Sequence, residues 1–374
     1  MTVIADIKRL TDEAAALLKG MISIPSPSFS EDEVCSYISG WMQDRNIAHE
    51  RVGNNLVASL MTEIGRPTLM LCAHIDTVTA SPDYSFDPYQ PDYQEAADII
   101  SNIRNEIVKP SDIVAGLGSN DDGASVTSMI AAYRYFLNNS GKAGIPNLIL
   151  VLTCEEERSG KNGMTGLWTE LDSRVDFAII GEPTGMKAAT SERGLLVIDA
   201  TAHGISGHAA RNEGQNALYK ALEDIQKLRR HEFERQSERM GKVNLNVTQI
   251  NAGTAHNVIP DRCDFVIDIR PTERYSNEEI LEELEKICSS ELKPRNLANR
   301  SSATFKDSPL QKAAEVLGIG TFSSPTTSDW MRISCDAIKM GPGESSRSHK
   351  KDEYVLVSEI ADGIRTYIDF INLL

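Results

Sequence analysis

The chain has 374 residues, which is too many for one ordinary hydrophobic core and too few for three comfortable domains, so two domains are expected. Hydrophobic residues make up 41% of the chain and charged residues 25%, values that are ordinary for a folded protein and argue against disorder. The formal net charge is −16 and the basic residues are scattered along the chain. Neither nucleic acid nor an anionic membrane is therefore an expected partner.

Residues 1–20 alternate charged and apolar side chains at helical spacing and lack the apolar core of a signal peptide. No stretch approaches the roughly 18 uninterrupted apolar residues of a membrane-spanning helix. The six cysteines are far apart and form no C-x-x-C motif, so neither a disulfide framework nor a cysteine metal site is indicated. We therefore expect a cytoplasmic protein with free thiols.

The N-terminal helix is expected to extend to about residue 22, because Pro25 and Pro27 follow it. Ser30, with Glu33 three residues later, predicts the N-cap and capping box of a second helix.

Beyond this point, strands and helices alternate. A surface excursion with one helical patch is expected at residues 81–114, which are rich in Pro, Asp and Tyr, and a further helix at residues 124–139. The alternation predicts an α/β domain with a mostly parallel sheet covered by helices. Apolar runs typical of its strands are residues 55–60, 67–74, 147–155 and 176–185.

Residues 185–294 have a different pattern, in which three segments alternate like half-exposed strands and two amphipathic helices lie among them. We expect an α+β domain inserted into the first domain. The predicted division is 1–184 and 295–374 for the first domain and 185–294 for the insert.

His74 and Asp76 lie in LCAHIDTV, at the carboxyl end of a predicted buried strand, where open α/β sheets place their ligand sites. A lone histidine is more often structural. The H-x-D spacing favours a metal ligand, because Asp76 can accept the imidazole N–H and leave the other ring nitrogen free for zinc.

Acidic residues follow other predicted strands or turns. Asp121 lies in the turn GLGSNDDG before a helix, and Glu182 follows the strand of IIGEPTG. Residues 155–157 are three glutamates directly after a buried strand, where they would repel one another without cations. Metal coordination together with a proton-carrying carboxylate would relieve this repulsion, although the turn at Asp121 alone is also typical of a helix cap.

His349 comes from a late glycine-rich loop. Two zinc ions carry four positive charges, which three carboxylates and a bridging hydroxide balance, so two metals are favoured over one. The candidate ligands of the two zinc ions are His74, Asp121, Glu157, Glu182 and His349.

The ordered motifs HIDTV, GLGSNDDG, TCEEE, IIGEPTG, SGHAA, NVIPDRCDFVIDIR and SHKKDE resemble a co-catalytic zinc family. That family includes acetylornithine deacetylase, succinyl-diaminopimelate desuccinylase, aminoacylase and glutamate carboxypeptidase. The resemblance covers essentially the whole chain. Two departures are Gly123, where relatives commonly have lysine, and Glu155, where they have aspartate.

The resemblance implies a role for each metal ligand. His74 and Glu182 would hold one Zn²⁺, Glu157 and His349 would hold the other, and Asp121 would bridge them, with Co²⁺ as a substitute metal.

The resemblance also implies roles next to the metals. Asp76 would orient His74 and Glu156 would be the general base, but the triple glutamate leaves open the alternative of Glu155 as base and Glu156 as ligand.

The insert resembles the family's lid and dimerisation domain, which implies a homodimer. His208 would stabilise the oxyanion in a partner subunit's site, and Asn257 and Arg270 would contact the substrate carboxylate. For Arg270, a surface ion pair with an acid is an equal alternative.

The expected activity is removal of an acetyl or succinyl group from a small-molecule N-acyl amino acid. Acetylornithine deacetylation, a step of arginine biosynthesis, is the first choice. A dipeptidase, a carboxypeptidase or a succinyl-diaminopimelate desuccinylase is the alternative within the family, and a catalytically inactive zinc-binding protein is the alternative outside enzymes.

Overall fold

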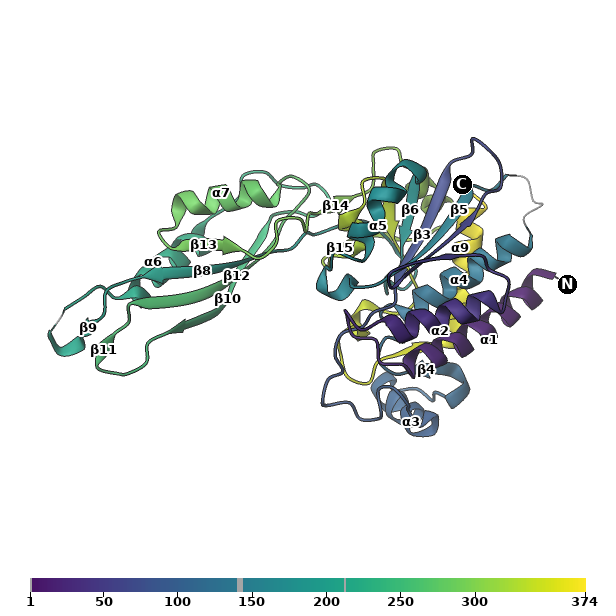
Figure 1. Ribbon diagram of the computed structural model, residues 1–374, viewed down its shortest axis with the longest axis horizontal. Helices are drawn as coiled ribbons and strands as arrows, with labels where there is room; N and C mark the ends of the chain where they lie inside the picture. The colour runs from purple at the N-terminus through teal and green to yellow at the C-terminus, as the bar shows by residue number, and fades with distance from the viewer. Residues whose placement is uncertain (1, 140–143, 212) are drawn as a thin grey trace. The chain divides into compact units, whose positions relative to one another are not determined.

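The computed structural model describes residues 2–139, 144–211 and 213–374, and the chain divides into two compact units. Unit 1 comprises Met1–Thr190, Thr304–Phe322 and Ser328–Leu374, and unit 2 comprises Ser191–Ala303 and Ser323–Thr327. Figure 1 shows the helices and strands of both units.

The sheet of unit 1 is mixed, with the order β1-β2-β5-β3-β6-β16-β7. Its four central strands, from β5 to β16, run parallel, while β1, β2 and β7 pair antiparallel at the two sides. The α/β class predicted from the sequence is confirmed, but the sheet is parallel only at its centre. The strands are β1 (Glu50–Val52), β2 (Asn55–Leu60), β3 (Thr68–His74), β5 (Asn147–Thr153), β6 (Phe177–Ile180), β7 (Ala188–Glu192) and β16 (Asp336–Lys339).

Helices cover both faces of this sheet, as Figure 1 shows. On β3, Leu69 and Leu71 pack into the core beneath one group of helices, while Met70 and Cys72 pack into the core beneath α5. This alternation follows from the two-residue period of a strand and explains why every residue of β3 is buried. The first group is α1 (Thr2–Ile22), α2 (Asp32–Gln43), α4 (Gly123–Asn138), α8 (Pro309–Val316) and α9 (Val357–Ile371), and α5 is Met164–Leu171.

The predicted excursion contains a helix, α3 (Tyr93–Arg104), which packs on a two-stranded sheet of β4 (Ile113–Ala115) and β17 (Tyr354–Leu356). A small apolar core of its own holds this part of unit 1 together. Short 3-10 helices also connect elements of unit 1, at Pro110–Asp112, Glu156–Arg158, Asp172–Arg174, Asp329–Arg332 and Ser345–Arg347.

The predicted cap of the second helix is wrong. Helix α2 begins at Asp32, and its N-cap residue is Glu31, whose side chain makes no capping hydrogen bond. The Glu31 carboxylate instead accepts the backbone N–H groups of Phe29 and Glu155. A long-range contact therefore takes the place of the local capping motif that Ser30 and Glu33 suggested.

Unit 2 is the inserted α+β domain. Its sheet has the antiparallel order β10-β12-β8-β13, and α6 and α7 pack on it around a separate hydrophobic core. The elements are β8 (Leu196–His203), β9 (Gly207–His208), a 3-10 turn (Ala209–Arg211), α6 (Ala217–Arg230), β10 (Asn244–Ala252), β11 (Val258–Ile259), β12 (Arg262–Arg270), α7 (Asn277–Ile287) and β13 (Glu291–Pro294). Two further short strands, β14 (Ser302–Ala303) and β15 (Thr321–Ser324), both pair with β7.

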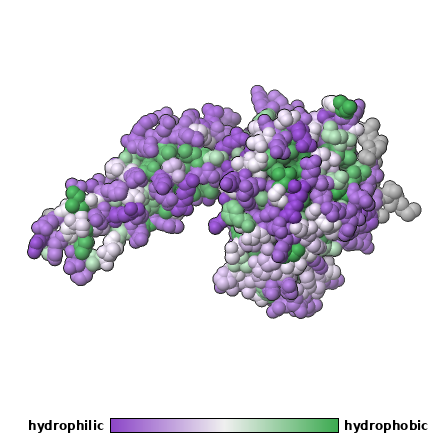
Figure 2. Space-filling model, viewed as in Figure 1, coloured by the Kyte–Doolittle hydropathy of each residue, from purple (hydrophilic) through white to green (hydrophobic). Residues whose placement is uncertain are grey.

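The surface in view in Figure 2 is mainly hydrophilic, with smaller hydrophobic areas. Within the part of the chain that the structure describes, none of the helices has the length and apolar character needed to cross a bilayer.

A buried carboxylate holds the turn between α7 and β13 in unit 2. Oδ2 of Asp224, on α6, accepts hydrogen bonds from the backbone N–H and the hydroxyl of both Ser289 and Ser290, and Oδ1 accepts one from Lys227. Burial opposes ionisation, but the hydrogen bonds from Lys227 and Ser290 outweigh it and hold the pKa of Asp224 below its usual value.

We expect Asp224→Asn to destabilise unit 2 by about 2–4 kcal/mol, because the amide must turn a donor toward other donors. Hydrogen exchange would show lower opening free energies for amides of α6 and β13, with the sheet of unit 1 as internal control. Because the native pKa is lowered, the stabilisation is complete above the unfolded-state pKa and is lost as the pH falls through the native one. Unchanged exchange in α6 and β13 would contradict this account.

Candidate metal centre

The carboxyl ends of the central parallel strands bring the candidate ligands to one edge of the sheet. His74 is the last residue of β3, Glu157 follows β5, and Glu182 follows β6. His349 comes from the loop between β16 and β17. Since β5, β3, β6 and β16 are neighbours that run in the same direction, residues distant in sequence meet there.

Asp121 lies between the two histidines. Its Oδ1 is 3.2 Å from Nε2 of His74, and its Oδ2 is 3.6 Å from Nε2 of His349. The Nε2 atom of His349 is also 3.0 Å from Oε1 of Glu157. One carboxylate thus presents a separate oxygen to each imidazole, as a ligand shared by two cations would.

Among the described residues, two groups of donor atoms are close enough to hold a metal ion. One group is His74, Glu156 and Glu182, and the other is His74, Asp121 and Glu157, with all atoms of a group within 4.8 Å of one another. Glu156 therefore lies as close to His74 and Glu182 as a ligand would.

Asp76 organises the turn that carries the glutamates. Its Oδ1 accepts the backbone N–H of Glu156 at 3.0 Å, and its Oδ2 accepts that of Glu157 at 3.1 Å and the hydroxyl of Ser28 at 2.7 Å. Nδ1 of His74 is 2.9 Å from the backbone oxygen of Asp76 and 3.4 Å from its Oδ1. Nδ1 of His74 therefore contacts the carboxylate that the H-x-D spacing suggested and, at a shorter distance, the main-chain oxygen of the same residue.

Glu155 differs from the two glutamates that follow it. Its backbone is left-handed, with φ of 60°, and its carboxylate accepts hydrogen bonds from the main chain and the side chain of Asn162. Its own N–H donates to Glu31. Successive N–H groups of this turn thus bind Glu31 and Asp76, and the Glu155 carboxylate is engaged by the following loop.

The titration properties follow from crowding. Burial, together with the neighbouring carboxylates of Asp329 and Glu157, raises the pKa of Glu156 well above its usual value. Burial and the charge of Asp121 do the same to the pKa of Glu182. The hydrogen bond to Glu157 raises the pKa of His349 to about 9.

For His74, burial favours the neutral ring, but hydrogen bonds to Asp121 and Asp76 raise its pKa well above the usual value. The buried glutamates thus resist losing their protons, and the imidazoles beside them retain theirs. Both effects indicate that the cluster lacks positive charge. Nitrogen and carboxylate oxygen donors are also what Zn²⁺ and similar divalent ions bind. The donor set therefore fits two divalent metal ions.

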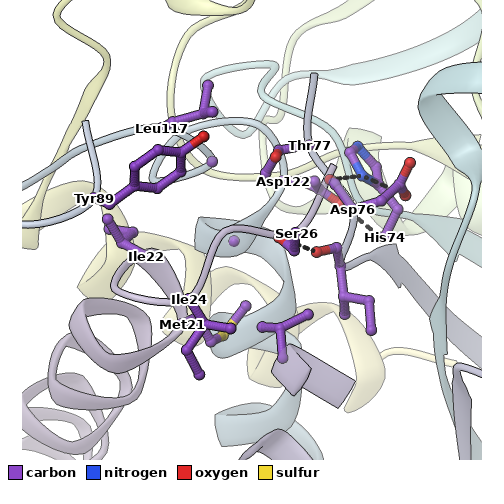
Figure 3. A pocket seen from close by; sticks show the side chains of 14 residues that line it. Met21, Ile22, Ile24, Ser26, His74, Asp76, Thr77, Tyr89, Leu117 and Asp122 are labelled. Atoms are coloured by element: carbon purple, nitrogen blue, oxygen red, sulfur yellow. Dashed lines mark hydrogen bonds and ion pairs between the residues drawn. The ribbon is translucent and has the colours of Figure 1, made fainter. Parts of the chain in front are cut away.

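A small cavity lies behind His74, between the end of α1 and the residues that follow β3 (Figure 3). Its polar side is formed by Asp76, Thr77 and Asp122 and its apolar side includes Met21 and Ile22. The volume of about 20 Å³ has room for about one water molecule. It is too small for an amino-acid substrate.

In unit 2, His208 and Asn257 lie close together. His208 on β9 pairs with Val258 on β11, and the N–H of Ala209 donates to the backbone oxygen of Asn257 at 3.1 Å. Both side chains are exposed.

Arg270 lies at the far end of β12, and its Nε and Nη2 donate to the two carboxylate oxygens of Asp268 at 2.9 and 3.1 Å. This contact is the ion pair with an acid that is the alternative role of Arg270. A substrate carboxylate would have to share the guanidinium with Asp268.

Some residues with long-range contacts in this centre were not identified from the sequence. Glu31 binds the glutamate turn, and Glu353 and Asn120 connect the Asp121 turn with the His349 loop. For Glu353, the sequence held one indication that the residue belongs to this site: it follows His349 in the motif SHKKDE.

Comparison with known proteins gives consistent matches. Residues 190–296 match the model of the peptidase dimerisation domain. A succinyl-diaminopimelate desuccinylase of Xanthomonas campestris is 26% identical over 79% of this chain and 81% of its own length.

Solved structures share the fold over nearly the whole chain. An M20 family metallo-carboxypeptidase of Sulfolobus solfataricus superimposes with a TM-score of 0.74 at 15% identity, covering 96% of this chain and 99% of that one. A dinuclear metal binding peptidase from the M20 family, from Bacillus subtilis, superimposes with a TM-score of 0.71 at 15% identity, covering 98% of each chain.

Proposed function

The chain belongs to the M20 family of hydrolases, and we propose that it removes an N-acyl group from an amino acid with the aid of two bound metal ions. The proposal rests on the position of the Asp121 carboxylate, which presents one oxygen to His74 and the other to His349. A pair of ions around a shared carboxylate is the arrangement that such a geometry supports.

We assign His74 and Glu182 to one metal, Glu157 and His349 to the other, and Asp121 to both. The 3.0 Å contact of His349 with Glu157 and the proximity of His74 to Glu182 support this division. Zn²⁺ is the proposed native metal, with Co²⁺ as a substitute. Bound divalent ions would polarise the amide carbonyl and lower the pKa of a water molecule.

We assign Glu156 as the residue that moves the proton. It would accept a proton from the attacking water as the new C–O bond forms, and donate it to the amine nitrogen as the C–N bond breaks. Burial raises its pKa well above that of an ordinary glutamate, which suits a carboxyl group that must both accept and donate a proton. The products are a carboxylate and a free amino acid.

The Glu155 alternative loses support, because its carboxylate is bound to Asn162 at 2.6 Å and its N–H to Glu31. Asp76 supports the assignment of Glu156, since both N–H groups of the Glu156–Glu157 turn donate to its carboxylate.

The dimerisation domain supports a homodimer through unit 2. Strand β10 is an edge strand of the sheet of unit 2. Exposed apolar side chains lie on this strand, at Ile250, and on α6, at Tyr219 and Leu222. We propose that these surfaces form the dimer contact. His208 would then stabilise the oxyanion in the site of the partner subunit, with Asn257 and Arg270 near the substrate carboxylate.

The substrate proposed here is an N-acyl amino acid in the cytoplasm. The sequence motifs favour acetylornithine as the substrate, whereas the relative from Xanthomonas campestris is named a succinyl-diaminopimelate desuccinylase. We therefore propose succinyl before acetyl as the acyl group. The peptidase names of the solved structures make dipeptides the second candidate.

We expect Glu156→Gln to retain both metals and to lower kcat by about 10²–10⁴, because an amide of the same size cannot accept the proton. Glu155→Gln is the matched control, since its side chain is engaged by Asn162, and should retain most activity. Metal content and kcat would be measured for both variants. Loss of kcat in the Glu155 variant alone would move the base to Glu155.

His208 can be tested by mixing subunits. Homodimers of His208→Ala and of Glu156→Gln should each be impaired, but a mixed dimer should regain activity, because one of its sites combines an intact base with the partner's intact histidine. The measurement is turnover after the two variants are dissociated and reassociated together. Activity that stays at the level of the separate variants would show that His208 does not act across the dimer.

A substrate panel tests the reaction itself. We expect N-succinyl amino acids to be hydrolysed faster than N-acetyl amino acids, including N-acetylornithine, and both faster than dipeptides, in assays with added Zn²⁺ or Co²⁺. Release of the free amine gives kcat/KM for each compound. Preference for dipeptides would replace the deacylase proposal with a peptidase, and no hydrolysis of any amide would favour the inactive metal-binding protein.

A further inference from the structure

Glu353 is a buried carboxylate outside the donor groups of the candidate metal centre. It lies four residues after His349, and only 2% of its surface is exposed. Its Oε1 accepts the backbone N–H groups of Asn120 and Asp121 at 2.8 and 2.9 Å, and its Oε2 accepts that of Gly118 at 3.1 Å. One side chain thus binds three main-chain donors of the turn that carries the shared ligand.

The same two segments are connected at further points. The N–H of Gly116 donates to the backbone oxygen of Glu353 at 2.9 Å, and β17 continues this contact by pairing with β4. From the other side, Oδ1 of Asn120 accepts the N–H of Glu344 at 2.9 Å, and its Nδ2 donates to the backbone oxygen of Glu344 at 3.1 Å. Hydrogen bonds therefore connect the turn with the His349 loop both before and after the histidine.

These contacts bear directly on the ligands, because the main chain of Asp121 itself donates to Glu353. Oδ2 of Asp121 and Nε2 of His349, 3.6 Å apart, come from the two connected segments. A shift of one segment relative to the other would change this separation. Residues that orient metal ligands from outside the coordination sphere typically change metal affinity or activity about 10–100-fold when replaced.

We propose that Glu353 is a positioning residue that holds the Asp121 turn and the His349 loop in register, so that both metal ions bind tightly. This inference rests on the proposed function, since it concerns the metal ligands of that site. Glu353 acts through the main chain and touches neither substrate nor metal. Its loss would leave buried N–H groups of the turn without their acceptor.

The test compares Glu353→Gln with Asp352→Asn. Asp352 is a neighbouring buried carboxyl group, but it accepts the N–H and the hydroxyl of Ser85 at 2.6 and 2.9 Å, and among the described residues its side chain makes no hydrogen bond with the Asp121 turn. Its φ of 60° suits asparagine, so the control substitution adds little backbone strain. Both variants replace one buried carboxyl group of the same loop with an amide of the same size.

The readout is metal affinity, measured on the full chain by competition of Co²⁺ and Zn²⁺ with a chelator, together with the visible absorption of the Co²⁺ protein. We expect dissociation constants about 10–100-fold higher for Glu353→Gln and an altered Co²⁺ spectrum. Asp352→Asn should bind Co²⁺ like the wild type even if its melting temperature falls as far. If the glutamine variant does not fold, Glu353→Asp, which keeps the carboxyl group on a shorter side chain, is measured instead.

Wild-type affinity and spectrum in the Glu353 variant, or equal weakening in the Asp352 control, would overturn the inference. Failure of the proposed function looks different, because a wild-type chain that binds two Co²⁺ ions but hydrolyses no substrate leaves the role of Glu353 standing. A wild-type chain that binds no Co²⁺ would overturn both.

Discussion

Repulsion among carboxylates at one edge of the sheet of unit 1 is the constraint on which the rest of the site depends. Glu156 and Glu182 lie there beside Asp121, and burial together with neighbouring carboxylates raises the pKa of both glutamates. A fold would avoid such crowding unless cations offset the negative charge. The parallel strands force the residues together, and the two imidazoles give the cluster the nitrogen donors of a transition-metal site.

The crowded side chains are held largely through the main chain. Asp76 and Glu31 accept N–H groups from the glutamate turn, and Glu353 accepts those of the aspartate turn. A carboxylate that binds several N–H groups fixes a turn more strongly than neutral groups would, because charged hydrogen bonds are stronger. The ligand side chains therefore project from rigid turns even though they follow the ends of strands.

The sequence predicted the α/β fold and the inserted domain well, because long buried strands and amphipathic helices have strong local periods. It also indicated which side chains follow the strands, and convergence of parallel strand ends brings these together in space. It did not predict the contacts of Glu31, because an acidic residue before a helix looks like part of a cap in the sequence. The contact of Glu155 with Asn162 likewise follows from no spacing rule. Asp268 lies two residues before Arg270 on the same strand, so the ion pair between them is the alternative that the sequence offered for Arg270.

The candidate ligands are spread along the chain from His74 to His349. During synthesis, a growing polypeptide presents the first histidine and all three acidic candidate ligands before the last histidine has been made. With the proposed ligand set, metal captured at that stage would have an incomplete set of donors and would dissociate readily. Full loading would then wait until the late loop has docked, and metal retention would report that translation and folding are both complete.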